Sequence, residues 1–216
     1  MTEYVTDEQR VEELKKWWKE NGNYLIGGVV LGLAILFGWN WWKDHKEERA
    51  RTASGIYSQL EQVVAAGDAE RARVLQGQLV GDFAATPYAA AAELTMAKLA
   101  VEQGDLTTAE LNLRSAIELA DQQAIRELAE LRLAYVLTAA GKADEALTIL
   151  DRDWDAAWTS LREELRGDAY AAKGDLDAAR QAYDKALLTA GGPASHLQLK
   201  RDALGAPAPA KQEASS

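Results

Sequence analysis

Cysteine is absent from this sequence of 216 residues, and so are the patterns that would indicate enzyme chemistry. Without cysteine the chain cannot form disulfides, thiolate nucleophiles or thiolate-bound metal sites. Its two histidines, His45 and His196, stand far apart, and neither belongs to a metal-ligand or catalytic pattern. Glycine-rich phosphate loops and the H-E-x-x-H and G-x-S-x-G motifs are missing too. We therefore predict a protein that is not an enzyme and that uses no metal or cofactor.

Positive charge is also scarce. The chain has 24 lysines and arginines against 34 aspartates and glutamates, which gives a formal net charge of −10. An acidic surface repels phosphate backbones, so the composition argues against nucleic acid as a partner.

What the chain does contain is a run of 19 uncharged, mostly apolar residues from Tyr24 to Trp42. A helix of this length covers roughly 28 Å, close to the thickness of a bilayer core. Aromatic residues stand at both ends, and Lys43 follows at once. A secretory leader is the main alternative, but the preceding 23 residues hold six acids beside four bases and no small-residue cleavage site follows. We predict an uncleaved transmembrane helix over residues 24–42.

Two features of the N-terminal region leave alternatives open. Gly28 and Gly32 form a small-x-x-x-small pair that could contact another membrane helix, although glycine is frequent in membrane helices anyway. Residues 1–23 predict a short amphipathic helix that ends at Asn21-Gly22 and lies on the membrane surface or docks on a partner. Four lysines and arginines flank the span on each side, so charge counting leaves the orientation undecided.

A spaced pattern of small residues recurs in the Ala-rich part of the chain. It is centred on Gly104, Gly141 and Gly174, which lie 37 and 33 residues apart, and Gly67 marks a weaker copy 37 residues earlier. The recurring small or bulky positions lie seven before, five after and nine after each of the three glycines: Ala97, Ala134 and Gly167; Ala109, Ala146 and Ala179; Leu113, Leu150 and Tyr183.

This spacing matches the tetratricopeptide repeat, in which small residues let two antiparallel helices pack tightly across a short turn. The match is partial, because Asp153 takes the place of a last small residue and the usual aromatic-leucine opening is replaced by glutamates: Glu93, Glu130 and Glu163. We predict an all-α protein in which the transmembrane helix is followed by a tetratricopeptide-repeat-like α-solenoid of about four helix pairs over residues 43–204. Residues 205–216 read as a disordered Pro/Ala tail.

The repeat suggests where a partner would bind. In tetratricopeptide arrays the first helix of each pair lines a concave groove, and the positions carried over to this chain are Lys98, Tyr135 and Asp168. Leu94, Val101 and Leu131 are expected nearby, although each leucine alone could be plain core. A groove of mixed polarity suits an extended peptide or a partner helix.

Two stretches, "WWKENGNYLIGGVVLGLAILFGWNWWKDH" and "LRGDAYAAKGDLDAARQAYDKAL", give the chain a further resemblance. It resembles the YfgM family of ancillary subunits of the bacterial SecYEG translocon over nearly its whole length. The resemblance implies a cytoplasmic N-terminus over residues 1–23, a single inner-membrane span and a periplasmic repeat domain. It also implies association with the translocon, with the membrane-anchored periplasmic chaperone PpiD and with exported client proteins, and a link to envelope-stress regulation. The residues alone leave another reading open: a membrane-tethered repeat scaffold for cell division or cytochrome maturation.

Overall fold

The computed structural model describes residues 7–205, and within them the chain is helical with no strand. Residues 1–6 and 206–216 lie outside the described part, so the expected tail over 205–216 stays a prediction. Contacts divide the chain into two compact units after Arg51. This border falls inside the first helix, α1, which runs from Asp7 to Ala65.

Helix α1 corrects one expectation, because it continues through Asn21-Gly22 instead of ending there. The side-chain amide of Asn21 donates a hydrogen bond to the carbonyl of Trp17 at 3.1 Å, one turn back. The indole of Trp18 covers Gly22, so closely that an added Cβ would lie 3.3 Å from the ring. Asn21 and Gly22 therefore both fit inside the helix, and the pair does not form the turn that an Asn-Gly sequence usually favours.

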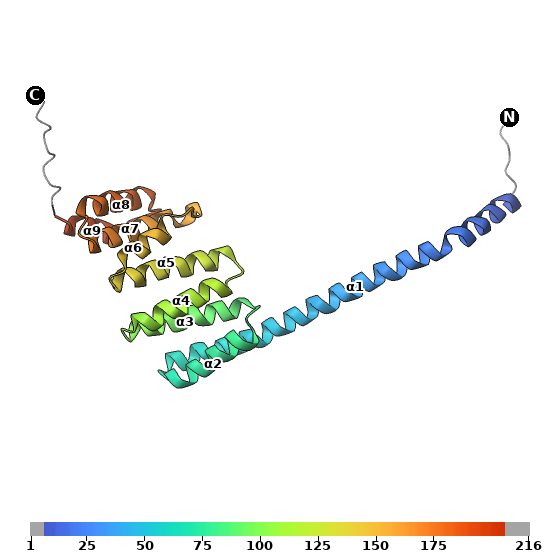
Figure 1. Ribbon diagram of the computed structural model, residues 1–216, viewed down its shortest axis with the longest axis horizontal. Coiled ribbons are helices and arrows are strands. Elements are labelled where there is room, and N and C mark those ends of the chain that lie inside the picture. The colour runs from blue at the N-terminus through green and yellow to red at the C-terminus, as the bar shows by residue number, and fades with distance from the viewer. Residues whose placement is uncertain (1–6, 206–216) are drawn as a thin grey trace, which may run out of the picture. The chain divides into compact units, whose positions relative to one another are not determined.

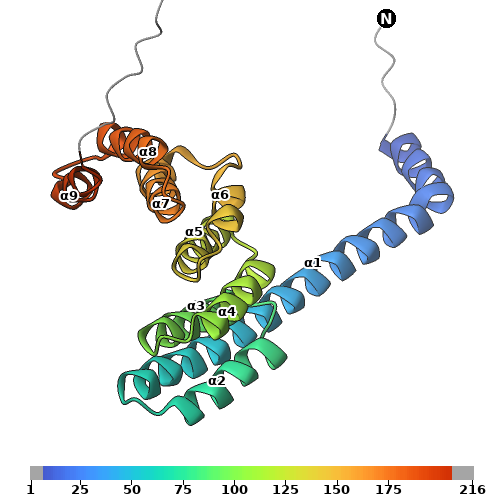
Figure 2. The ribbon, with the colours of Figure 1, turned by 60° about the vertical axis from the view of Figure 1, so that its left-hand side comes forward.

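The second unit holds the end of α1 and eight further α-helices among the described residues. Their bounds are α2 Ala69–Asp82, α3 Pro87–Glu102, α4 Leu106–Leu119, α5 Gln123–Ala139, α6 Ala143–Leu150, α7 Thr159–Ala172, α8 Leu176–Thr189 and α9 Ser195–Ala203, with a short 3₁₀ helix, η1, over Ala156–Trp158 before α7. From α3 onward each helix packs beside the one before it, as Figures 1 and 2 show. This arrangement confirms the predicted solenoid of helix pairs.

The turns inside the pairs explain the regular spacing. Gly67, Gly104, Gly141 and Gly174 all adopt positive φ angles between 76° and 80°, a conformation that suits glycine. Each glycine ends the first helix of its pair in a Schellman motif, in which the next residue's N–H reaches back to a carbonyl five residues earlier. In three pairs that next residue is an aspartate, and its carboxylate accepts a backbone N–H at the start of the second helix: Asp68, Asp105 and Asp175.

The third pair lacks this cap and is the irregular one. Lys142 follows Gly141 and gives α6 no side-chain cap, and α6 has only eight residues, where α4 and α8 have 14 each. Asp153, the residue that departs from the repeat, therefore lies beyond the helix in an exposed segment. The polar residue is tolerated at this position because no neighbouring helix packs on it.

The core is built from the small residues that the repeat predicts. Ala109, Ala146 and Ala179 are fully buried, as are Ala116 and Ala186. The main hydrophobic cluster runs from α3 to α7, and a second cluster joins the end of α1 to α2 and α3 through residues such as Ala53, Leu60 and Leu79. The two clusters hold the first helices of successive pairs in place beside one another, and these helices line the candidate groove.

Candidate functional site

The apolar part of α1 presents its side chains outward. Within residues 10–65 an 18-residue window has a mean hydropathy of 1.6, and only 6% of that window is buried, so this helix is long and apolar enough to cross a membrane. A core helix of the same composition would be covered by other helices. At its end Trp39 and Trp42 pack at 5.4 Å between ring centroids, and the ammonium of Lys46 lies 5.5 Å above the Trp42 ring.

Gly28 and Gly32 lie on this exposed helix. An added Cβ would meet no atom within 4 Å at either glycine. Their backbone is therefore open to a neighbour, and their role as a helix contact remains a prediction.

The second unit carries two adjoining cavities, and together we call them the repeat groove. The smaller, of about 360 Å³, is lined by four of the six predicted groove residues: Leu94, Lys98, Val101 and Tyr135. The larger, of about 680 Å³, extends toward the end of α1, where Tyr57, Glu61 and Val64 line it. Leu94, Lys98, Glu102 and Arg132 line both cavities, so the repeat groove is continuous from α1 across α3 to α5.

The other two predicted residues lie outside the repeat groove. Leu131 is 1% exposed and belongs to the core. Asp168 is engaged by the chain itself, in a group that we call the Lys200 cluster: Glu164, Asp168, Tyr183, His196 and Lys200. Helical spacing places Leu131 and Asp168 correctly on first helices, but it does not show which neighbouring side chains cover them.

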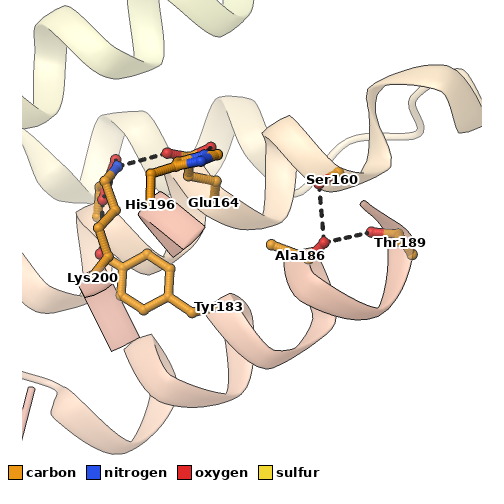
Figure 3. A network of polar contacts seen from close by, with 8 residues as sticks. Ser160, Glu164, Tyr183, Ala186, Thr189, His196 and Lys200 are labelled. Carbon is orange, nitrogen blue, oxygen red and sulfur yellow. Dashed lines mark hydrogen bonds and ion pairs between the residues drawn. The ribbon is translucent and has the colours of Figure 1, made fainter. Parts of the chain in front are cut away.

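The Lys200 cluster ties the last helix to α7 and α8 (Figure 3). The ammonium of Lys200 donates to Glu164 Oε1 and to Asp168 Oδ2, both at 2.8 Å, and the phenol of Tyr183 donates to Asp168 Oδ1 at 2.7 Å. Burial and the hydrogen bond to Asp168 both raise the pKa of Tyr183 above its ordinary value, so the phenol stays protonated. Burial lowers the pKa of Lys200, but the bonds to Asp168 and Glu164 outweigh it and raise that pKa.

Sequence reasoning missed the contribution of α1 to the repeat groove. Glu61 lies six residues before Gly67, as Lys98 lies six before Gly104 and Tyr135 six before Gly141. Counting back from the weaker first turn would have found Glu61. The hydroxyls of Tyr57 and Thr95 lie 3.1 Å apart and join this part of α1 to α3.

The glutamates that replace the usual repeat opening are all buried, although polar. Glu93 accepts hydrogen bonds from Gln76 at 2.9 Å and Ser115 at 3.1 Å, which joins α3 to α2 and α4. Glu130 pairs with Arg152, and Glu163 lies 2.7 Å from Arg162. Burial raises the pKa of Glu93, and the two hydrogen bonds oppose this rise. Only Glu93 joins neighbouring helices, since the partners of Glu163 lie on α7 itself and Arg152 lies beyond the end of α6. None of the three carboxylates lines the repeat groove.

Among residues 7–205, no group of three or more histidine, aspartate or glutamate side chains could hold a metal ion. The repeat groove offers apolar walls, two tyrosines and four charged side chains, which together can bind a polypeptide segment.

Comparison with known proteins finds similarity over nearly the whole chain, including both the apolar helix and the repeats. The sequence profile of the tetratricopeptide repeat-like domain matches residues 15–206. A protein of Haemophilus influenzae named ancillary SecYEG translocon subunit is 33% identical over 84% of this chain and 89% of its own length. Its namesake from Escherichia coli is 32% identical over 84% of this chain and 87% of its own length, and one from Neisseria gonorrhoeae is 25% identical over 87% and 90%. No solved structure gives a significant match.

Proposed function

The chain belongs to the tetratricopeptide repeat-like family that includes the ancillary SecYEG translocon subunits, and from this premise we propose that it is a non-enzymatic accessory of the Sec translocon. The observation that carries the proposal is the extent of the similarity. The family profile covers residues 15–206, which include the apolar helix as well as the repeats, and this supports one shared plan of a membrane helix followed by a repeat domain.

The two parts take different tasks in this proposal. Residues 24–42 anchor the protein in the inner membrane, and the face with Gly28 and Gly32 contacts a translocon helix. Residues 1–23 lie in the cytoplasm, and residues 43–204 form a periplasmic repeat domain that ends before the tail at 205–216. The repeat groove then binds a PpiD-like chaperone or an exported client, because mixed apolar and charged walls suit a polypeptide. A link to envelope-stress regulation would follow from the state of these complexes.

Co-purification tests the proposal. The full-length protein, extracted from inner membranes in a mild detergent, is expected to bring down SecYEG subunits together with a PpiD-like chaperone. Replacing Gly28 and Gly32 with leucine should remove the translocon and keep the chaperone, because bulky side chains prevent close helix approach. Tyr135→Ala in the repeat groove should do the reverse. Val74→Ala, on an exposed face of α2, is the matched control and should change neither.

The proposal fails if the native protein brings down neither complex. Orientation is tested separately, with a reporter fused after Ser216 that is active on only one side of the membrane. Activity in the periplasm is expected, and activity confined to the cytoplasm would contradict a role beside exported chains.

A further inference from the structure

Arg132 stands where the two cavities of the repeat groove meet, since it lines both of them. Leu94 lines both cavities as well, and Leu128 lines the larger one. A chain lying in the repeat groove would therefore pass the Arg132 guanidinium between the mainly apolar smaller cavity and the larger one, whose lining mixes leucines with polar side chains such as Glu61 and Thr95.

This guanidinium makes no ion pair or hydrogen bond with any other residue between 7 and 205. Three other charged side chains line the repeat groove, namely Glu61, Lys98 and Glu102. Lys98 lies 3.8 Å from Glu102, and Glu61 interacts with the phenol of Tyr57. The charge of Arg132 also acts on the phenol of Tyr57, but Arg132 is the cation of the repeat groove that has no carboxylate partner among the described residues.

At the α7 end of the same repeat array, charged side chains are neutralised by ion pairs within the chain. Asp168 occupies the position equivalent to Lys98 and Tyr135, six residues before its turn glycine. There the carboxylates of Glu164 and Asp168 receive a cation from α9, and Lys200 is held by both of them. Lys200 therefore neutralises the acidic end of the array from within the chain. No carboxylate among residues 7–205 does the same for Arg132 on α5.

We infer that the repeat groove binds an internal, acidic segment of another protein, with one aspartate or glutamate carboxylate on Arg132 and apolar side chains in the cavities on either side. A guanidinium can donate two parallel hydrogen bonds to a carboxylate, and partial desolvation between leucines strengthens them. Because a cavity lies on each side of Arg132, the carboxylate belongs to a side chain within the segment and not to a chain end. The inference rests on the proposed function and specifies the chemistry of its partner.

Fluorescence anisotropy with defined peptides tests this inference on the full-length protein in lipid nanodiscs. The probe is a fluorescein-labelled nonapeptide with leucine–aspartate–leucine at its centre and serine and glycine around it, and its twin carries asparagine in place of aspartate. We expect the aspartate peptide to bind about tenfold more tightly than its twin, as for a hydrogen bond between charged groups. Arg132→Gln should abolish that difference and leave binding of the asparagine peptide unchanged.

The matched control is Arg71→Gln, which removes an exposed arginine on α2 outside both cavities and should leave the difference intact. Empty nanodiscs give the baseline for peptide partitioning into lipid. Equal binding of the two peptides, no binding of either, or an equal loss in Arg71→Gln and Arg132→Gln would each overturn the inference. Co-purification with SecYEG is scored on the same Arg132→Gln protein, so the inference can fail while the translocon association stands.

Discussion

The helix pairs α3–α4 and α7–α8 both pack closely, but they divide the side-chain volume between the two helices differently. In α3–α4 the two equivalent positions hold Ala97 and Leu113, both buried. In α7–α8 they hold Gly167 and Tyr183, and a Cβ added at Gly167 would lie 2.5 Å from Cδ1 of the tyrosine ring. The smaller residue on α7, Gly167, leaves space that the larger residue on α8, Tyr183, fills. The repeat therefore preserves the combined volume at the two positions and not the residue type at either one.

The same two pairs differ in how they satisfy a buried carboxylate. Glu93 on α3 is held by neutral donors, Gln76 and Ser115. Its equivalent on α7, Glu163, accepts a hydrogen bond from a cation, Arg162, at 2.7 Å through one oxygen, and its other oxygen has no hydrogen-bond partner among the described residues. The same repeat position on the first helix thus accepts either neutral or charged donors beside its buried carboxylate.

The largest effect is expected from Gly167→Ala. The added methyl group collides with a packed aromatic ring, so we expect the free energy of unfolding to fall by about 2–3 kcal/mol, near the upper end for overpacking. Thermal unfolding of the full-length protein, followed by circular dichroism in mild detergent, measures the loss.

A double variant tests the explanation. Adding Tyr183→Leu to Gly167→Ala rebuilds the alanine–leucine pair of α3–α4 and should recover most of the loss, apart from the hydrogen bond that Tyr183 donates to Asp168. If the single variant were as stable as the native protein, the exchange of volume would not describe this pair.

A smaller effect is expected where the two pairs agree. Gly104 and Gly174 have φ angles of 76° and 80°, so alanine at either position is strained. Each substitution should cost about 1 kcal/mol. The same unfolding measurement should give nearly equal losses for Gly104→Ala and Gly174→Ala. Gly77→Ala, in the interior of α2 with open space around it, should be neutral or slightly stabilising. A large difference between the two turn variants would show that the turns are not equivalent.

The smallest expected effect concerns the neutral network around Glu93. Its pKa in the folded chain is raised by burial, so the folded state binds the proton more tightly than the unfolded state does. The stability contributed by this group is therefore greatest at acidic pH and falls as pH rises from its ordinary pKa through the raised one. Glu93→Gln should remove this fall and leave the protein about 0.5 kcal/mol more stable at neutral pH. Melting curves at pH 4 and pH 7 measure it, with exposed Glu118→Gln as the control.

Much of the repeat could be predicted because local chemistry fixes it. A glycine followed by aspartate specifies a left-handed turn and a helix cap within four residues, as Gly104 and Asp105 show. Spacing counted from these turns therefore placed the helix pairs and most groove residues without knowledge of distant contacts. Pro87, the first residue of α3, favours a helix start for a similarly local reason, because its fixed φ angle suits the first helical position.

The remainder depends on contacts between residues far apart in the sequence. Asp168 was expected in the groove, but Lys200 covers it from 32 residues away, and no spacing rule fixes how α9 docks. Asn21-Gly22 reads locally as a turn, yet the Trp18 ring packs over Gly22 within one continuous helix. Arg132 was not predicted either, because its importance arises only where two cavities meet.

The hydrogen bonds that Lys200 donates to Glu164 and Asp168 also affect its reactivity. An amine that holds its proton and donates to two carboxylates is a poor nucleophile, whereas the ammonium of Lys98 is largely exposed. Acylating agents and glycating sugars should therefore modify Lys98 well before they reach Lys200, and the attachment of α9 should outlast the binding surface as the protein ages.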